Sequence, residues 1–280
     1  MKNIFLAILL FILSIFGANA ETIRFVTPYN PGGGGYAVSQ VLASELKQRG
    51  WNIDHKDIGN CAIVKTEFVE TKNPTILLWE NNLSADKLDK CFIEIKETQF
   101  VSYLTSSPNY ICVRPDSGIA AEDLFTKPLK MNISPDVYSL RAFHQLKTLL
   151  GNPNLKTVVY TNSGAARTAF VAGEIDIFYG TNAVAIMKEK QGVCFYNTGA
   201  TELNGTKPIS SVLPKKFEQY FAFMLLSNNL STTQQEKLRT DLKEIKETKA
   251  WKDATARYSA VALKDKKDEY QFIMDTLPKE

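Results

Sequence analysis

Histidine is scarce in this sequence: the 280 residues include two, His55 and His144, and there is no CxxC pair. Metal sites in proteins draw mainly on histidine and cysteine side chains held at close spacing. The composition therefore argues against a zinc centre, and no metal ligand is predicted. No serine lies in a GxSxG motif either, so the usual signature of an α/β-hydrolase nucleophile is missing. We interpret His144 as a surface or core residue.

Motifs for phosphate-bearing cofactors are also missing. The glycine run Gly32–Gly35 is not followed by Lys-Ser or Lys-Thr, as a P-loop requires. A dinucleotide-binding GxGxxG motif would need glycine at position 37 or 38, where the chain has alanine and valine. No cofactor is predicted.

The chain has no strong excess of charge of either sign. The formal net charge is +3, and it becomes +2 once Lys2 is removed. Acidic and basic residues are interspersed, for example over 237–252, which indicates a solvated helix face. Proteins that bind nucleic acid instead carry clustered basic surfaces. We therefore predict no nucleic-acid partner, and we find no internal repeat.

After residue 20 the chain has no apolar run long enough to span a membrane. The apolar run at 4–16 follows Lys2 and precedes Ala18-Asn19-Ala20, a small-x-small cleavage site. These features are typical of a secretory signal peptide, which we place at 1–20 with cleavage after Ala20. The remainder is expected to be exported, and no cysteine follows the cleavage site to carry a lipid anchor.

The most informative segment is 27–36, which contains the four glycines. It follows an apolar run at 23–26 that predicts a buried strand, and it precedes 37–46, where apolar residues recur at helical spacing. Glycine in such a turn permits positive φ angles and lets a ligand approach the backbone closely. The free N–H groups of the first helical turn favour an anion there. A carboxylate and a phosphate would both fit.

The pattern of strand, turn and helix recurs along the chain. Further strands are predicted at 52–58 and 75–79, with a helix at 62–70 between them. This βαβαβ order indicates a parallel sheet whose strands end at the same edge. A second parallel set is predicted from strands at 130–134, 156–160, 175–179 and 193–196 and helices at 140–150 and 165–172.

The end of the chain determines how these two units connect. A strand at 221–227 precedes helices at 232–249, 250–259 and 266–277. A chain that begins in one lobe, builds a second and finishes with helices usually closes back on the first. We predict an α/β fold of two lobes with a ligand cleft between them. Lobe 1 comprises 21–105 and 223–280, and lobe 2 comprises 106–222.

All four cysteines, Cys61, Cys91, Cys112 and Cys194, lie in the exported part. Two disulfides are expected in an oxidising compartment, and three pairings are possible. We favour Cys61 with Cys91 and Cys112 with Cys194, because each bond then stays within one lobe.

Taken together, several segments resemble the solute receptors of tripartite tricarboxylate transporters, the Bug-type periplasmic binding proteins. The resemblance covers most of the chain after residue 20 and depends on the order and spacing of its motifs. They match the family's first strand with its Pro-Gly-Gly turn and helix, the entry to a further strand, a strand with its turn, and a second-lobe strand with a Gly-x-x-Asp motif. These segments are 23–46, 73–78, 109–124 and 159–176.

This resemblance implies a type II periplasmic-binding-protein fold, with crossing strands near 101–113 and 220–227. It implies a monomeric, non-enzymatic receptor in the periplasm. The ligand would be a small organic anion, such as a di- or tricarboxylate or an acidic amino acid, which is delivered to a membrane permease. The implied ligand-binding residues are Tyr29, Gly33, Gly34, Gly35, Tyr36, Asn60, Ser134, Ser139, Ser163, Gly164, Ala165, Thr181 and Asn182.

The chain also departs from the family pattern. Tyr36 and Gln40 stand where the family usually has Asp and Arg, and Tyr36 could place its phenol over the ligand. Asp136 beside Ser134 would disfavour an anion, and it would suit the ammonium group of an amino acid. Arg167 could reach a second carboxylate, although an exposed arginine on a helix face is the commoner outcome.

Two other functions remain open from the sequence. An exported hydrolase would need a nucleophile, a base and an acid within reach of one another, and His144 would be the candidate base. A sensory or interaction module would present its closed lobes to a partner, with the ligand as a signal.

Overall fold

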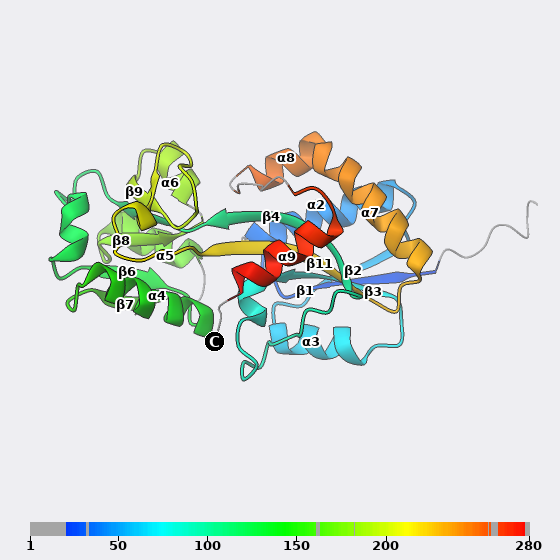
Figure 1. The fold of residues 1–280 in the computed structure, drawn as a ribbon. Helices are drawn as coiled ribbons and strands as arrows, with labels where there is room; N and C mark the ends of the chain where they lie inside the picture. Colours follow the sequence, from blue (N-terminus) through cyan, green and yellow to red (C-terminus); the bar gives the residue numbers. More distant parts are fainter. Residues whose placement is uncertain are drawn as a thin grey trace, which may run out of the picture.

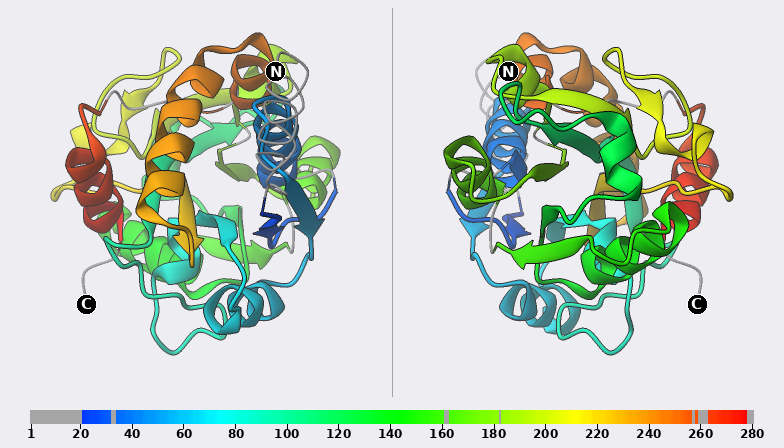
Figure 2. Two further views of the ribbon diagram at one scale, coloured as in Figure 1. Left: turned by 90° about the vertical axis from the view of Figure 1, so that its right-hand side faces the viewer. Right: turned by 90° about the vertical axis from the view of Figure 1, so that its left-hand side faces the viewer.

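The computed structural model describes residues 21–31, 34–160, 163–181, 183–256, 258 and 263–277. This part of the chain forms two lobes, each built on its own sheet (Figure 1). Views along the long axis show helices arranged around the strands (Figure 2). The predicted signal peptide, 1–20, lies outside the described residues. Within the described ranges, no helix combines the length and apolar character needed to cross a membrane.

The sheet of lobe 1 consists of β1 (Ile23–Thr27), β2 (Ile53–Asp57), β3 (Thr75–Glu80), β4 (Phe100–Pro108) and β11 (Tyr220–Asn228). Their spatial order is β2-β1-β3-β11-β4. The first three strands are parallel, as the βαβαβ pattern predicts. β11 is antiparallel to both of its neighbours, β3 and β4.

Helices cover both faces of this sheet. Strand alternation sends Ile76 and Leu78 of β3 to one face and Leu77 and Trp79 to the other. Because both faces are covered, β3 is apolar without interruption from Ile76 to Trp79. The first face packs against α2 (Gly34–Gln48), α7 (Thr232–Glu247) and α8 (Lys249–Thr255), and the second against α3 (Cys61–Glu70) and α9 (Lys266–Thr276).

The sheet of lobe 2 consists of β5 (Tyr110–Val113), β6 (Lys130–Ile133), β7 (Lys156–Val159), β8 (Ile177–Gly180), β9 (Val193–Asn197) and β10 (Lys207–Pro208). The order is β10-β9-β5-β8-β6-β7. β6 pairs in parallel with β7 and β8, as predicted. The four strands predicted as a second parallel set do run in one direction, because β8 and β9 are each antiparallel to β5. The prediction did not include β5, which enters the sheet between β8 and β9.

Three helices and three 3-10 turns complete the elements described in the two lobes. The helices α4, α5 and α6 follow β6, β7 and β8 in turn. Their bounds are α4 (Val137–Leu150), α5 (Ser163–Ala172), α6 (Ala183–Lys188), η1 (Asn81–Ser84), η2 (Ala121–Phe125) and η3 (Ile209–Ser211).

The long strands β4 and β11 lie side by side and lead from lobe 1 toward lobe 2 (Figure 1). β4 ends at Pro108 and β5 begins at Tyr110, while β11 begins at Tyr220. The predicted lobe boundaries, 105/106 and 222/223, therefore fall inside the two crossing strands.

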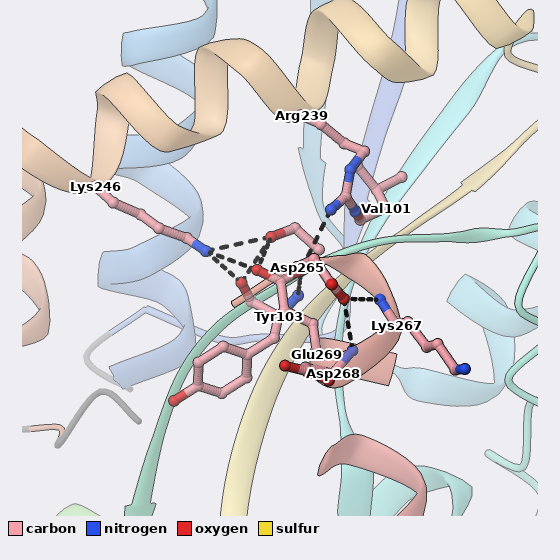
Figure 3. Close-up of polar contacts among 9 residues, drawn as sticks. Val101, Tyr103, Arg239, Lys246, Asp265, Lys267, Asp268 and Glu269 are labelled. Carbon is pink, nitrogen blue, oxygen red and sulfur yellow. Dashed lines mark hydrogen bonds and ion pairs between the residues drawn. The ribbon is translucent and has the colours of Figure 1, made fainter. Parts of the chain in front are cut away.

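β4 is an edge strand of the lobe 1 sheet, and charged side chains from α7 and α9 bond to its backbone (Figure 3). Lys246 Nζ donates to the Tyr103 carbonyl at 2.6 Å, and Arg239 donates to the Val101 carbonyl. The Glu269 carboxylate accepts from the Tyr103 N–H at 3.2 Å and lies 3.6 Å from Lys246 Nζ. Without these side chains, the backbone N–H and carbonyl groups on the open side of the edge strand would be unpaired.

Both predicted disulfides are confirmed. Cys61 is bonded to Cys91, which joins the start of α3 to the loop before β4. Cys112 is bonded to Cys194, and these two residues face each other in the β5–β9 register. Each bond therefore links segments of a single lobe.

Candidate functional site

A cavity of about 660 Å³ lies between the lobes. It is bordered by the segments that follow β1, β6, β7 and β8, which is the sheet edge where open α/β folds bind ligands. Its lining residues are Pro28, Tyr29, Asn30, Pro31, Gly34, Gly35, Glu80, Asn109, Asn132, Ile133, Ser134, Ser139, Tyr160, Ser163, Gly164, Ala166, Phe178, Tyr179, Gly180, Thr181, Phe221, Phe223 and Tyr258.

The lobe 1 wall is built on the glycine turn after β1. The described part of this turn resumes at Gly34, where α2 begins. Gly35 is buried against the ring of Tyr29: a Cβ atom at Gly35 would lie 2.6 Å from two of the ring carbons. The Tyr29 ring also packs edge-on against Phe223, with 5.7 Å between the ring centroids. Close packing against an aromatic ring therefore requires glycine at position 35.

The lobe 2 wall is built on the turns after β6 and β7. Asp136 is the N-cap of α4, and its carboxylate accepts from both the N–H and the hydroxyl of Ser139, each at 2.8 Å. Ser163 and Gly164 form the start of α5 and are exposed where they line the cavity. The two lobes thus each contribute the start of a helix to the same space.

These helix starts define what the cavity can hold. The first turn of a helix carries N–H groups without intrahelical acceptors, and the positive end of the helix dipole adds to their attraction for anions. α2 begins at Gly34 in one lobe and α5 begins at Ser163 in the other. An anionic group between them could be held by backbone donors without a basic side chain.

Most of the predicted ligand-binding residues lie together in this cavity. Asn60 is not among the lining residues; its side-chain oxygen caps α3 by accepting from the N–H groups of Ala62 and Ile63 at 3.0 and 3.3 Å. Tyr36 and Ala165 do not line the cavity either, and Gly33 and Asn182 lie outside the described residues. The predicted residues that line it are Tyr29, Gly34, Gly35, Ser134, Ser139, Ser163, Gly164 and Thr181.

The two departures from the family pattern lie behind the glycine turn. Gln40 donates its side-chain amide to Asp57 at 2.6 Å. The hydroxyls of Ser39 and Thr27 also donate to Asp57, at 2.8 and 2.5 Å. Three neutral donors therefore satisfy this carboxylate. It is Tyr29, rather than Tyr36, that presents a phenol ring to the cavity.

Glu80, which was not predicted from the sequence, is the last residue of β3 and lines the cavity. Burial raises the pKa of Glu80 to about 8, and the nearby Asp136 carboxylate acts in the same direction. Burial also raises the pKa of Asp136, although the hydrogen bonds from Ser139 oppose this shift. The sequence feature that could have identified Glu80 is its position as a charged residue directly after the apolar run at 75–79, at the sheet edge where ligands bind.

Aromatic rings make up much of the remaining wall, and two amides brace it. Asn132 exchanges two 2.8 Å hydrogen bonds with the backbone of Tyr179, which fixes β6 beside β8. Asn109 donates its amide to Gln219 at 3.0 Å. The aromatic lining residues are Tyr29, Tyr160, Phe178, Tyr179, Phe221, Phe223 and Tyr258.

Arg167 is directed to other partners. Its guanidinium donates to the Gln191 side chain at 2.7 Å and forms an ion pair with Glu189. It is not among the lining residues, so the structure gives no support to contact with a second carboxylate.

The remaining candidates also lie away from the cavity. His144 borders a separate groove on α4, and His55 stacks on Phe25 with 4.8 Å between the ring centroids. Asp176 accepts from the backbone N–H of Lys130 at 2.7 Å, which is a structural role.

No family model matches the sequence, and no curated protein matches it. Several solved structures, however, match the fold of this chain. The periplasmic binding protein BugD superposes with a TM-score of 0.73 at 14% identity, over 92% of this chain and 94% of BugD. An R. palustris protein with adipate gives a TM-score of 0.74 at 14% identity, over 91% and 93% of the two chains. MatC from Rhodopseudomonas palustris, with bound malate, gives 0.70 at 15% identity, over 91% and 96%.

These superpositions establish the fold of the chain, but sequence identities this low do not establish its ligand. They agree with the two-sheet architecture, the crossing strands and the cavity between the lobes. The resemblance predicted from the sequence is therefore confirmed at the level of structure: the chain has the two-lobe, type II fold of periplasmic binding proteins.

Proposed function

We propose that this protein is a Bug-type solute receptor, which captures a small carboxylate between its lobes and performs no covalent chemistry on it. The observation that carries this proposal is the meeting of two helix starts, α2 at Gly34 and α5 at Ser163, on one cavity. Backbone N–H groups at these two helix starts would bind the carboxylate from both sides. The lobes could then close around the ligand without basic side chains in the cavity.

The size of the cavity fits this role. A volume of about 660 Å³ falls within the range of roughly 300 to 1,000 Å³ that is usual for small-molecule sites. Two structural neighbours, each at 14 to 15% identity, hold adipate and malate. Both compounds are small carboxylates, and this supports the ligand class proposed for the present chain.

The architecture also supports capture by lobe closure. Two crossing strands connect the lobes, and such connections act as hinges when a ligand joins two faces. The signal peptide predicted at 1–20 supports a periplasmic location. From the family resemblance, the partner would be a membrane permease that accepts the ligand from a monomeric receptor.

A thermal-shift screen of the purified protein against small organic acids and amino acids tests this function. A ligand that binds only the folded state at a hundred times its Kd adds about 2.7 kcal/mol, which corresponds to a rise in Tm of roughly 5 to 10 °C for a chain of this size. The matched amides and esters, which lack the carboxylate, serve as controls. The proposal fails if no carboxylate raises Tm, or if the uncharged analogues raise it equally.

A further inference from the structure

One end of the cavity is acidic. Glu80 is a lining residue, and Asp136 lies close enough to raise its pKa. The described lining residues include no lysine, arginine or histidine. A second carboxylate on the ligand would therefore bring negative charge to Glu80 without a cation to balance it.

Among the described residues, the titratable groups that interact with Glu80 are Asp136 and Tyr29. Asp136 faces it from the start of α4, and Tyr29 faces it from the turn after β1. Tyr258 interacts in turn with Tyr29, and Asp89 with Asp136. The Asp136 carboxylate disfavours a charged Glu80, so a positive group beside the two carboxyl groups would be favoured by both.

Two polar residues, Tyr29 and Glu80, lie at this end of the cavity. The Tyr29 hydroxyl oxygen is buried and has no hydrogen-bond partner among the described residues. Glu80 stands at the N-cap position of η1, yet its carboxyl makes no capping hydrogen bond. Buried polar groups in proteins are nearly always paired, so the Tyr29 hydroxyl is suited to a partner that enters from the cavity beside the Glu80 carboxyl.

Aromatic rings adjoin this acidic end. Phe223 lies opposite Glu80 in the β3–β11 register. Its ring makes edge-on contacts with Tyr29 and Tyr258, at centroid distances of 5.7 and 5.3 Å. The faces of aromatic rings attract organic cations, so this combination of rings and carboxyl groups is typical of a site for an ammonium group.

We infer that the ligand is a small zwitterion. Its carboxylate lies at the starts of α2 and α5, and its ammonium group lies beside Glu80, Asp136 and the aromatic rings. This inference rests on the proposed function and narrows the ligand class from carboxylates in general to amino acids and related amino carboxylates. Glu80 is then the residue that selects against di- and tricarboxylates.

The pH dependence of binding distinguishes this inference from the alternative, in which protonated Glu80 donates a hydrogen bond to a second carboxylate of the ligand. Because burial raises the pKa of Glu80 to about 8, an ammonium ligand must displace a proton, and its affinity should rise between about pH 6 and pH 8. A dicarboxylate would instead accept a hydrogen bond from protonated Glu80. Its affinity would then fall as the pH rises above 8.

Titration calorimetry of the purified protein with matched pairs tests the inference. The pairs are 6-aminohexanoate with adipate, 4-aminobutyrate with succinate, and phenylalanine with 3-phenylpropanoate. In at least one pair the zwitterion should bind about tenfold more tightly or better, as expected for a charge-assisted contact. Glu80→Gln should remove most of that preference, whereas Glu94→Gln, which neutralises an exposed acid away from the cavity, should leave it unchanged.

Asp136→Asn provides a second variant in case Glu80→Gln impairs folding, because asparagine retains the oxygen that caps α4. It should also lower the preference for the zwitterion. If dicarboxylates bind more tightly than their amino partners, or if neither variant alters the preference, the inference is overturned while the proposed function stands. If no compound with a carboxylate binds, the proposed function fails and the inference fails with it.

Discussion

At the scale of single residues, Glu80 has the most unusual environment among the groups that line the cavity. Strand alternation places Glu80 on the same face of β3 as Ile76 and Leu78, which is the face that α2 covers. The apolar strand therefore ends with a carboxyl group directed toward the start of α2. Carboxyl groups held where burial opposes their charge cluster at functional sites.

The ligand-free protein should lose stability as the pH rises, in part because of Glu80. Its folded pKa of about 8 lies above the value of about 4.3 in unfolded chains, so the folded state binds the extra proton. The stabilisation is complete below the unfolded pKa and is lost as the pH rises through about 8. Between pH 5 and pH 9 the free energy of unfolding of the wild type should fall by a few kcal/mol through this group, and that of Glu80→Gln should not. Urea unfolding at pH 5, 7 and 9 measures the difference.

Glu94→Gln supplies the control for that experiment, since Glu94 is exposed and lies outside the cavity. It should keep the pH slope of the wild type. Equal slopes for the wild type and Glu80→Gln would contradict the environment assigned to this carboxyl.

Gly35→Ala should weaken ligand binding by about tenfold or more, because the Tyr29 ring must move to make room for the new Cβ atom. Gly118→Ala is the matched control. Gly118 has a φ of +64° and open space around its Cβ position, so alanine there affects stability without touching the cavity. Calorimetry on both variants measures the difference, and equal affinities would show that the fit of Gly35 against Tyr29 is not needed for binding.

At the scale of elements, the crossing strand β4 depends on the helices of the chain's end. Lys246 of α7 and Glu269 of α9 are both largely buried, with side-chain exposures of 25% and 13%. Burial lowers the pKa of Lys246, while Glu269 opposes that shift. Lys246 bonds to the backbone carbonyl of Tyr103 and Glu269 to its backbone N–H. The pair therefore links α7 and α9 to the crossing strand β4.

Removing one member of this pair should be costly, because the other charge is left buried without its partner. Glu269→Gln or Lys246→Met should each lower the free energy of unfolding by about 2 to 4 kcal/mol. The double variant Lys246→Met with Glu269→Met should lose less than the sum of the two single losses. Urea denaturation measures all three, and strictly additive losses would show that the two side chains do not act as a pair.

Much of the fold could be predicted from local patterns. The parallel strands β1 and β3 are short apolar runs bounded by turn residues, and α7 begins with a capping box at Ser231 and Gln234. β4 could not be recognised in this way. Its nine residues are all buried and include Ser102, Thr105 and Ser106, so no alternation of polar and apolar residues marks it. The direction of β5 likewise depends on a partner strand from elsewhere in the chain.

The site was predictable to the extent that topology alone determines it. Turns after parallel strands meet at one edge, which places Ser134 and Ser163 at the same edge of the lobe 2 sheet. That these residues share a cleft with Tyr29 of lobe 1 was implied by the family resemblance. The acidic end was not predictable from the sequence. Glu80 and Asp136 are far apart along the chain and meet because the two lobes face each other across the cavity.

At the scale of the whole molecule, the lobes touch at the border of the cavity. Arg141 of α4 forms an ion pair with Asp86, which follows η1 in lobe 1, at 2.9 Å. The Tyr138 hydroxyl donates to the Tyr220 carbonyl at 3.2 Å. Contacts of this kind change when lobes move about a hinge, so in the lobe closure that we propose they would contribute to the balance between open and closed forms.

Arg141→Ala should shift that balance only slightly. The Arg141 side chain is 52% exposed, and exposed ion pairs contribute at most about 1 kcal/mol. We expect less than a fivefold loss of ligand affinity and a larger radius of gyration for the ligand-free variant in X-ray scattering. A loss of a hundredfold would mean that the pair is part of the binding site itself.

The most direct test of the central claim is a crystal structure with the tightest-binding carboxylate found in the screen. Its carboxylate oxygens should lie about 2.7 to 3.2 Å from backbone nitrogens at the start of α2, near Gly34 and Gly35, and at the start of α5, near Ser163 and Gly164. A ligand bound outside this cavity, or one whose carboxylate contacts neither helix start, would contradict the account.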